Sequence, residues 1–196
     1  MSEGPQWRIR SQQLLFDNEF LIIRRTVAED DARGTIREHF VHDGPDSVLC
    51  IALLPDGTIP LVRQFRIPVN SECLDFPAGS VETGDASVEQ AVLRELREET
   101  GLTASSAQLI GVLQKDPGFS SARLHVFVAR PQVPVDWTPA GNEGTVELLT
   151  VGQLLQEIAH GRLACSQCVA AMMLAQMHSA FDPTAPPPGS DGTRPS

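Results

Sequence analysis

The chain lacks any long apolar segment. No hydrophobic run approaches the ~18 residues that a transmembrane helix requires, so the sequence predicts no membrane span. Residues 1–5 show no basic region followed by an apolar stretch, and a signal peptide is therefore not expected. Both absences favour a cytoplasmic location.

Positive charge is also scarce. Lys and Arg number 15 against 25 Asp and Glu, which gives a formal net charge of −10 at pH 7. Such a chain repels a phosphate backbone unless it carries a strong local basic patch, and its basic clusters, such as Arg24 with Arg25, are short. We expect a small phosphorylated substrate held in one pocket, with no nucleic-acid or membrane partner.

Cysteine is limited to four residues. Cys50 and Cys73 lie in apolar, strand-like segments, where a free cysteine behaves as a small hydrophobic residue. Cys165 and Cys168 have C-x-x-C spacing, but a structural zinc site needs four ligands and no second pair is found. We interpret this pair as helix packing in a protein of the reducing cytoplasm.

The apolar patterning predicts strands mixed with helices. Strands are expected at 20–23, 35–41, 47–54, 59–65, 73–76, 107–114, 124–129 and 145–151. Helices are expected at 87–100, 153–160 and 166–178. Because the two types do not alternate strictly, an α+β or layered α/β/α domain fits best.

Two local patterns carry specific expectations. Residues 55–58 are a hairpin-type turn signal, which makes 59–65 the return strand after 47–54. The last helix has an apolar stripe at helical spacing, which we interpret as core. The stripe consists of Val169, Met172, Met173 and Met177.

The length of 196 residues suits one domain and is short for two. We assign 1–45 to N-terminal strands of the same unit and 46–180 to the main domain. Residues 181–196 are rich in proline and small polar residues and cannot bury enough apolar surface to fold, so we expect a disordered tail.

The helix expected at 87–100 carries a cluster of carboxylates. Ser87 followed by Gln90 is a capping-box pattern, and Gly101 is a C-terminal stop. At about 100° per residue, the acidic residues continue the stripe that the apolar residues begin. The acidic residues are Glu95, Glu98 and Glu99, and the apolar residues are Val88, Ala91 and Val92.

Carboxylates on that side should face the body of the protein, where like charges repel and lose hydration. A hard divalent cation with oxygen ligands offsets both costs, and Mg²⁺ is the usual choice beside phosphate. A solvated face with an Arg94–Glu98 pair is the alternative. The glycine-rich loop at 76–85 can turn backbone groups towards a metal or phosphate, which favours the metal site.

These residues resemble the Nudix box, G-x5-E-x7-R-E-U-x-E-E-x-G-U, in which U is aliphatic. The second half matches position by position, at Arg94, Glu95, Leu96, Glu98, Glu99, Gly101 and Leu102. In the first half, counted from Gly79, Asp85 stands where the pattern has Glu, and eight residues instead of seven precede Arg94. We infer a one-residue insertion near Ala86 and assign no role to Asp85.

The resemblance extends over about 14–178 and looks like the ADP-ribose pyrophosphatase branch, through 61–68 before 74–79 and 116–121 before 124–127. It implies an α+β fold, namely an α/β/α sandwich with a mixed sheet and an N-terminal antiparallel sheet. It also implies a homodimer formed through the N-terminal strands, which would otherwise leave a sheet edge exposed.

The resemblance implies roles for residues of the box. Glu95 and Glu99 would be the principal ligands of Mg²⁺, with Mn²⁺ possible in its place. Glu98 would be a further ligand, and Ala78 would offer its backbone carbonyl. Arg94 would orient the carboxylates by ion pairing and counts with Glu98 among the catalytic residues.

Further residues would act on the substrate. Arg66 would contact the diphosphate, with Arg63 as a second candidate. The acid that activates water would be Glu143, in a late loop, with Glu147 as the second choice. The positioned water would attack phosphorus in line while the metal neutralises developing charge.

ADP-ribose would be cleaved to AMP and ribose 5-phosphate. A UDP-sugar or another nucleoside diphosphate sugar remains an alternative substrate, because the metal site is the same for all of them. A non-catalytic nucleotide sensor of the same fold is the alternative outside the enzyme class. The retained Glu95, Glu98 and Glu99 favour the enzyme.

Overall fold

The computed structural model describes residues 7–18, 21–139 and 144–181. Glu143 and the expected tail lie outside these ranges, apart from Phe181. The chain divides into two compact units. The first contains the N-terminal residues up to Asp46 together with Gln114–Arg123, and the second contains Ser47–Leu113 and the residues from Leu124 onwards.

The first unit is built on a three-stranded antiparallel sheet in the order β1-β2-β3. Its strands are β1 (Trp7–Asp17), β2 (Ile22–Asp30) and β3 (Thr35–His42). Gly34 closes the β2–β3 turn at φ 63°, a conformation that glycine adopts without a Cβ penalty, and its N–H donates to the Asp30 carbonyl at 2.8 Å. The strand expected at 35–41 is confirmed, whereas the one expected at 20–23 begins at Ile22 and continues to Asp30.

The segment Gln114–Arg123 is held to the end of β3 within the same unit. The N–H of His42 donates to the Phe119 carbonyl at 2.7 Å, and the two rings stack with centroids 5.9 Å apart. The Ser121 hydroxyl donates to Asp43 at 2.7 Å. These contacts give the loop that contains Pro117 and Gly118 a defined attachment.

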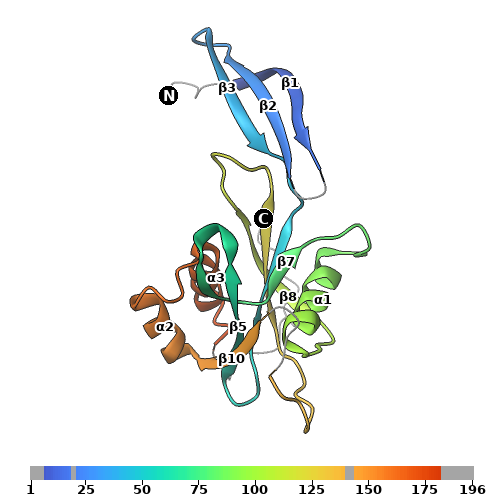
Figure 1. Ribbon diagram of the computed structural model, residues 1–196, viewed down its shortest axis with the longest axis vertical. Coiled ribbons are helices and arrows are strands. Elements are labelled where there is room, and N and C mark those ends of the chain that lie inside the picture. Colours follow the sequence, from blue (N-terminus) through green and yellow to red (C-terminus); the bar gives the residue numbers. More distant parts are fainter. Residues whose placement is uncertain (1–6, 19–20, 140–143, 182–196) are drawn as a thin grey trace. The chain divides into compact units, whose positions relative to one another are not determined.

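The second unit contains two sheets (Figure 1). The four-stranded sheet has the order β7-β4-β9-β8, with β4 parallel to β9 and antiparallel to β7. Its strands are β4 (Ser47–Ala52), β7 (Ala78–Ser80), β8 (Ala107–Gln114) and β9 (Arg123–Ala129). The three-stranded sheet β10-β5-β6 consists of β5 (Thr58–Arg66), β6 (Ser71–Asp75) and β10 (Thr145–Thr150). A short 3₁₀ turn, η1 (Ile67–Val69), links β5 to β6.

The hairpin expected at residues 55–58 is only partly right. The turn forms, because the N–H of Leu54 donates to the Thr58 carbonyl at 2.9 Å and Gly57 adopts φ 82°. The strands on either side then enter different sheets. The buried β4 pairs with β7 and β9 while β5 pairs with β6 and β10, so each strand satisfies its backbone groups without the other.

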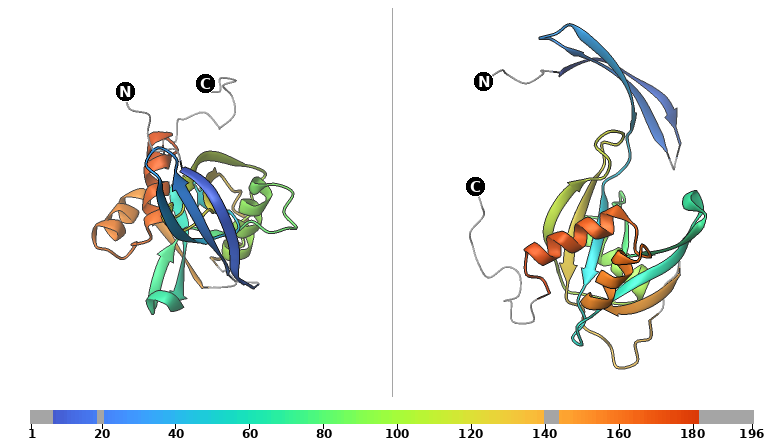
Figure 2. Two further views of the ribbon diagram at one scale, coloured as in Figure 1. Left: turned by 90° about the horizontal axis from the view of Figure 1, so that it is seen from above. Right: turned by 90° about the vertical axis from the view of Figure 1, so that its left-hand side faces the viewer.

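Helices cover both faces of this unit (Figure 2). They are α1 (Val88–Thr100), α2 (Val151–Ala159) and α3 (Ser166–Met177). Successive side chains of β4 point to opposite faces: Cys50 packs with α1 residues, and Ile51 packs with residues of α2 and α3. The expected α/β/α sandwich with a mixed sheet is therefore confirmed.

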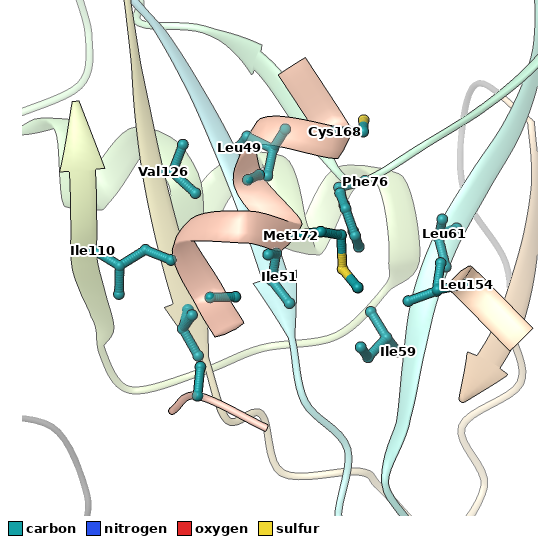
Figure 3. Packing of buried hydrophobic residues seen from close by; sticks show 14 of the residues in the cluster. Leu49, Ile51, Ile59, Leu61, Phe76, Ile110, Val126, Leu154, Cys168 and Met172 are labelled. Atoms are coloured by element: carbon teal, nitrogen blue, oxygen red, sulfur yellow. The ribbon is translucent and has the colours of Figure 1, made fainter. Parts of the chain in front are cut away.

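The packing of α3 differs from the expectation (Figure 3). Met172 is buried, but Met173 is 62% and Met177 is 73% exposed, so interpreting the whole stripe as core was wrong. The buried face of α3 consists of Cys168, Ala171, Met172 and Ala175. Three of these four side chains are small, which allows the helix to lie close to the sheet, and Met173 and Met177 point outwards. No helix in the described ranges has the length and apolar character to cross a membrane.

Candidate metal and diphosphate site

The register of α1 is set by its two ends. At the start, the Ser87 hydroxyl accepts a hydrogen bond from the Gln90 N–H at 3.1 Å. At the end, Gly101 adopts φ 73° and its N–H donates to the Arg97 carbonyl at 2.9 Å. Both caps were expected, and they determine which side chains face the sheet.

The acidic half of α1 turns inwards. Glu95 and Glu99 are buried on the same side as Ala91 and Val92, whereas the Glu98 side chain is 42% exposed. Burial raises the pKa of Glu95. Arg94 lowers this pKa in part, and the nearby charge of Glu98 raises it further. The inward stripe expected from the helical spacing is thus confirmed for Glu95 and Glu99, and a fully solvated face is excluded.

Strand β7 lies directly against these carboxylates. A Cβ at Gly79 would overlap the Glu95 carboxylate, so any larger residue there would require this carboxylate to move. The N–H of Ala78 donates to Glu99 Oε2 at 2.9 Å. The loop and the helix therefore meet at Gly79 and Ala78, as the sequence suggested for the strand–loop–helix arrangement.

Arg94 connects the acidic groups. Its Nη1 donates to Glu95 Oε1 at 2.8 Å and to Glu98 Oε2 at 3.1 Å. Its Nη2 donates to the Ser80 carbonyl at 3.0 Å, and its Nε donates to Asp85 Oδ1 at 3.1 Å. One guanidinium thus ties two helix carboxylates to the strand and loop before the helix.

Asp85 is a site residue that the sequence analysis missed. Its side chain is 7% exposed and receives two hydrogen bonds from Arg94, at 3.1 and 3.0 Å. Arg94, followed by the N–H of Glu82, lowers the pKa of the Asp85 carboxyl. Asp is shorter than the Glu of the Nudix box, and one more residue separates it from Arg94, but the Asp85 carboxylate still reaches Arg94. The acidic side chain at this position of the box was the sequence signal that could have identified it.

The two candidate substrate arginines are both ion-paired. Arg66 donates to Asp75 Oδ2 from Nη2 at 3.0 Å and from Nε at 3.2 Å. Arg63 pairs with Glu147 across neighbouring strands, with one bond from Nη2 at 3.2 Å. Glu147, the second choice for activating water, is thus held by Arg63.

The donor set on α1 fits a hard divalent cation. It consists of carboxylate oxygens at a buried position, with a raised pKa at Glu95 that reflects the cost of holding charge there. Within the described ranges, three His, Cys, Asp or Glu ligand atoms lie within 4.8 Å of one another only at Asp75, Cys165 and Cys168. The carboxylates of α1 therefore do not form such a close group of three ligand atoms, and Arg94 is hydrogen-bonded to two of them, Glu95 and Glu98.

Comparison with known proteins agrees with this geometry. Residues 44–165 match the model of the NUDIX domain, which is more than half of the chain. The chain belongs to the Nudix family. The Nudix box residues are those that the structure assembles around Arg94 and Gly79.

Two relatives of this Nudix protein differ in what they are named for. The ADP-ribose pyrophosphatase of Bacillus subtilis is 40% identical over 99 residues, which are 50% of this chain and 52% of that protein. The chain thus spans about half the length of this relative. The GDP-mannose pyrophosphatase of Yersinia enterocolitica is 30% identical over 187 residues, covering 87% of this chain and 94% of that protein.

A solved structure supports the Nudix fold. The crystal structure of an ADP compounds hydrolase superposes with a TM-score of 0.75 at 20% identity, covering 94% of this chain and all of that one. At this identity the likeness concerns the fold alone.

Proposed function

We propose that this Nudix protein hydrolyses the diphosphate bond of ADP-ribose, or of a related nucleoside diphosphate sugar, in a Mg²⁺-dependent reaction. ADP-ribose would yield AMP and ribose 5-phosphate. The observation that carries the proposal is the buried carboxylate pair Glu95 and Glu99 beside the Gly79 loop, where Glu95 accepts from Arg94 and Glu99 accepts from the Ala78 N–H. A buried like-charged pair is costly unless a cation enters.

The metal would be held by oxygen ligands from two neighbouring elements. Glu95, Glu99 and the more exposed Glu98 would contribute carboxylates from α1, and Ala78 would contribute its carbonyl from β7. Bound Mg²⁺, or Mn²⁺ in its place, supplies charge neutralisation at the phosphate and lowers the pKa of a coordinated water. Arg94 keeps Glu95 and Glu98 oriented, and Asp85 in turn orients Arg94.

Binding of the diphosphate is assigned to Arg66, with Arg63 as a second contact. Asp75 holds Arg66 from one side, and Arg66 lines a cavity of about 540 Å³ together with Asp75. Both arginines are ion-paired, but the Arg66 side chain is 44% exposed against 29% for Arg63, which makes Arg66 the stronger candidate. Glu143 is proposed to activate the water, with Glu147 as the second choice.

The base and sugar are the open part of the proposal. ADP-ribose and GDP-mannose appear in the names of the two relatives, and a UDP-sugar uses the same metal chemistry. The decisive experiment measures kcat/KM for ADP-ribose, GDP-mannose, a UDP-sugar and dGTP, with Mg²⁺ and with EDTA. We expect the highest kcat/KM for ADP-ribose. A higher kcat/KM for dGTP would contradict the assignment to the ADP-ribose pyrophosphatase branch. An absence of Mg²⁺-dependent turnover would favour a nucleotide sensor.

We also propose a homodimer formed through the N-terminal sheet. Within the first unit, many large apolar side chains are more than a third exposed, more than a stable monomer normally shows together. They are Trp7, Ile9, Leu14, Leu15, Phe16, Leu21, Ile36, Phe40 and Phe119. Light scattering at micromolar concentration should give a dimer mass. Phe40→Asp should lower that mass and His39→Asp, on the same strand, should not; a monomeric wild type would overturn the assignment.

A further inference from the structure

A pair of thiols lies at the start of α3, away from the carboxylate cluster of α1. Cys165 is the N-cap residue, with an extended backbone at φ −64° and ψ 115°, and Cys168 is in the first turn. Cys168 is 1% exposed and Cys165 is half-buried. The two sulfurs and a carboxylate oxygen of Asp75 all lie within 4.8 Å of one another.

The buried Cys168 thiol is hydrogen-bonded to a residue of strand β6. The Cys168 Sγ donates to Asp75 Oδ1 at 3.7 Å, and the other oxygen of the same carboxylate binds Arg66. Figure 3 shows the Cys168 side chain beside Phe76, next to Asp75 in the chain. A buried acid beside a buried thiol is a group that can take the thiol proton.

The half-buried thiol is reachable. Cys165 lines the cavity of about 540 Å³ that also contains Asp75 and Arg66, a volume in the range of small-molecule sites. Cys73 lines the same cavity and provides an internal comparison. Cys50 is fully buried, and burial raises its pKa to about 12, so it does not compete as a thiolate.

We propose that Cys165 and Cys168 are a reactive dithiol, which low-molecular-weight disulfides entering this cavity convert to an intrachain disulfide. The Cys165 thiolate attacks one sulfur of RSSR, forming a mixed disulfide and releasing RS⁻. Cys168 gives its proton to Asp75 and attacks the Cys165 sulfur, which releases the second RS⁻. Two protein thiols are oxidised and RSSR is reduced to two RSH. The proton taken up by Asp75 passes to one released thiolate, and the other thiolate takes from solvent the proton that Cys165 had lost.

The electrostatics agree with these two roles. The Cys168 thiol, and to a smaller extent the N–H groups of Cys168 and Gln167, lower the pKa of Cys165 to about 6. The interaction with Cys165 and burial raise the pKa of Cys168, which keeps it as the proton-bearing partner. The attacking and resolving positions are therefore distinct, and the two sulfurs, which lie within 4.8 Å of each other, would approach to about 2.05 Å in the disulfide.

Mass spectrometry tests the proposal on the full chain. The reduced protein is incubated with glutathione disulfide, quenched in acid, alkylated in denaturant and mapped by peptide. The expected product leaves only Cys50 and Cys73 alkylated, with a Cys165–Cys168 cross-linked peptide. Cys73→Ser should give the same cross-link, and Cys168→Ser should stop at a glutathione adduct on Cys165.

Other outcomes overturn the proposal. One is full alkylation of all four cysteines after oxidation, and another is a Cys73–Cys165 cross-link. A third is one equivalent of zinc that purifies with the protein and blocks oxidation until it is chelated, which would make Asp75, Cys165 and Cys168 a metal site. The wild-type map decides the question even if a variant at the buried Cys168 fails to fold.

A pH measurement tests the assignment of the attacking thiol. The thiolate is the reactive form, so alkylation of Cys165 by iodoacetamide should rise through a midpoint near pH 6 instead of the ~8.5 of a free cysteine. Cys168→Ala removes the largest stabilising donor and should move that midpoint upwards. An ordinary midpoint in the wild type would overturn the assignment.

The link to Arg66 rests on the proposed function. Oxidation removes the thiol donor from Asp75, so we expect the KM for ADP-ribose to rise several-fold and to return with dithiothreitol. A protein that hydrolyses no substrate but still forms the disulfide would refute the proposed function alone. Turnover with the same KM in both states would refute the link through Asp75 and leave the function standing.

Discussion

Helices α1 and α3 cover opposite faces of the same unit, and the residues that each helix packs against the sheet differ in kind. Against the sheet, α1 places Ala91, Val92 and Leu96 and then continues with Glu95 and Glu99. In α3 the buried face contains only thiol, methyl and thioether groups. The charged face is held by hydrogen bonds from Arg94 and the Ala78 N–H, whereas the α3 face is held by close contact and by the hydrogen bond from Cys168 to Asp75. The inward acidic face of α1 is the basis of the proposed metal site, whereas the small and apolar residues of α3 serve packing.

The largest expected effect is on α1. Glu99→Gln preserves size and can still accept from the Ala78 N–H but removes a charge that we propose binds the metal, so we expect kcat to fall at least about 100-fold. Stability of the metal-free protein should hold or rise, because a like-charge repulsion is relieved. Glu89→Gln in the first turn of the same helix is the control and should turn over normally. Near-normal Mg²⁺-dependent turnover of Glu99→Gln would contradict its assignment as a ligand.

A smaller effect is expected at the glycine beneath the carboxylates. In Gly79→Ala the new methyl group would displace the Glu95 carboxylate, so activity should fall about tenfold or more, while the free energy of unfolding should fall by no more than about 1 kcal/mol because the displaced group is the end of a flexible side chain. Gly84→Ala in the same loop meets nothing within 4 Å and is the matched control. Steady-state kinetics and urea unfolding measure both. If the two variants behave alike, the close approach of β7 to α1 is not required.

On α3 the same kind of change should affect stability alone. Ala171→Leu overpacks a fully buried position, and we expect a loss of about 1–3 kcal/mol in the free energy of unfolding, with kcat unchanged in the fraction that is folded. Urea denaturation with a parallel assay checks this. A large drop in kcat at full folding would mean that α3 contributes to the site more directly than its packing suggests.

The smallest effect is expected at the outward methionine. Met173→Ala should change the free energy of unfolding by no more than about 0.5 kcal/mol, because this side chain is 62% exposed. Met172→Ala, one residue away and buried, should cost about 2–5 kcal/mol and calibrates the comparison. Equal losses in the two variants would restore the original interpretation of the stripe as core.

The contrast between the helices also explains what could be predicted. In α1, two caps and the switch from apolar to acidic residues on one face define a direction, so the inward position of Glu95 and Glu99 followed from spacing. In α3, apolar and small residues occur all round the helix, and periodicity alone did not separate Ala171 from Met173. The β4–β5 turn was recognised from Gly57, but the choice of sheet depends on partners far along the chain.

By itself, the sequence determined the elements, the fold class and the acidic face of α1, because caps, turns and helical spacing act over a few residues. Only the tertiary structure decided which distant side chains meet. Arg63 forms an ion pair with Glu147, 84 residues away in the sequence, and Cys168 forms a hydrogen bond with Asp75, 93 residues away. Such partners are selected by sheet pairing and by the packing of α3 on the sheet. The cost of leaving a buried polar group unpaired then makes each pairing specific.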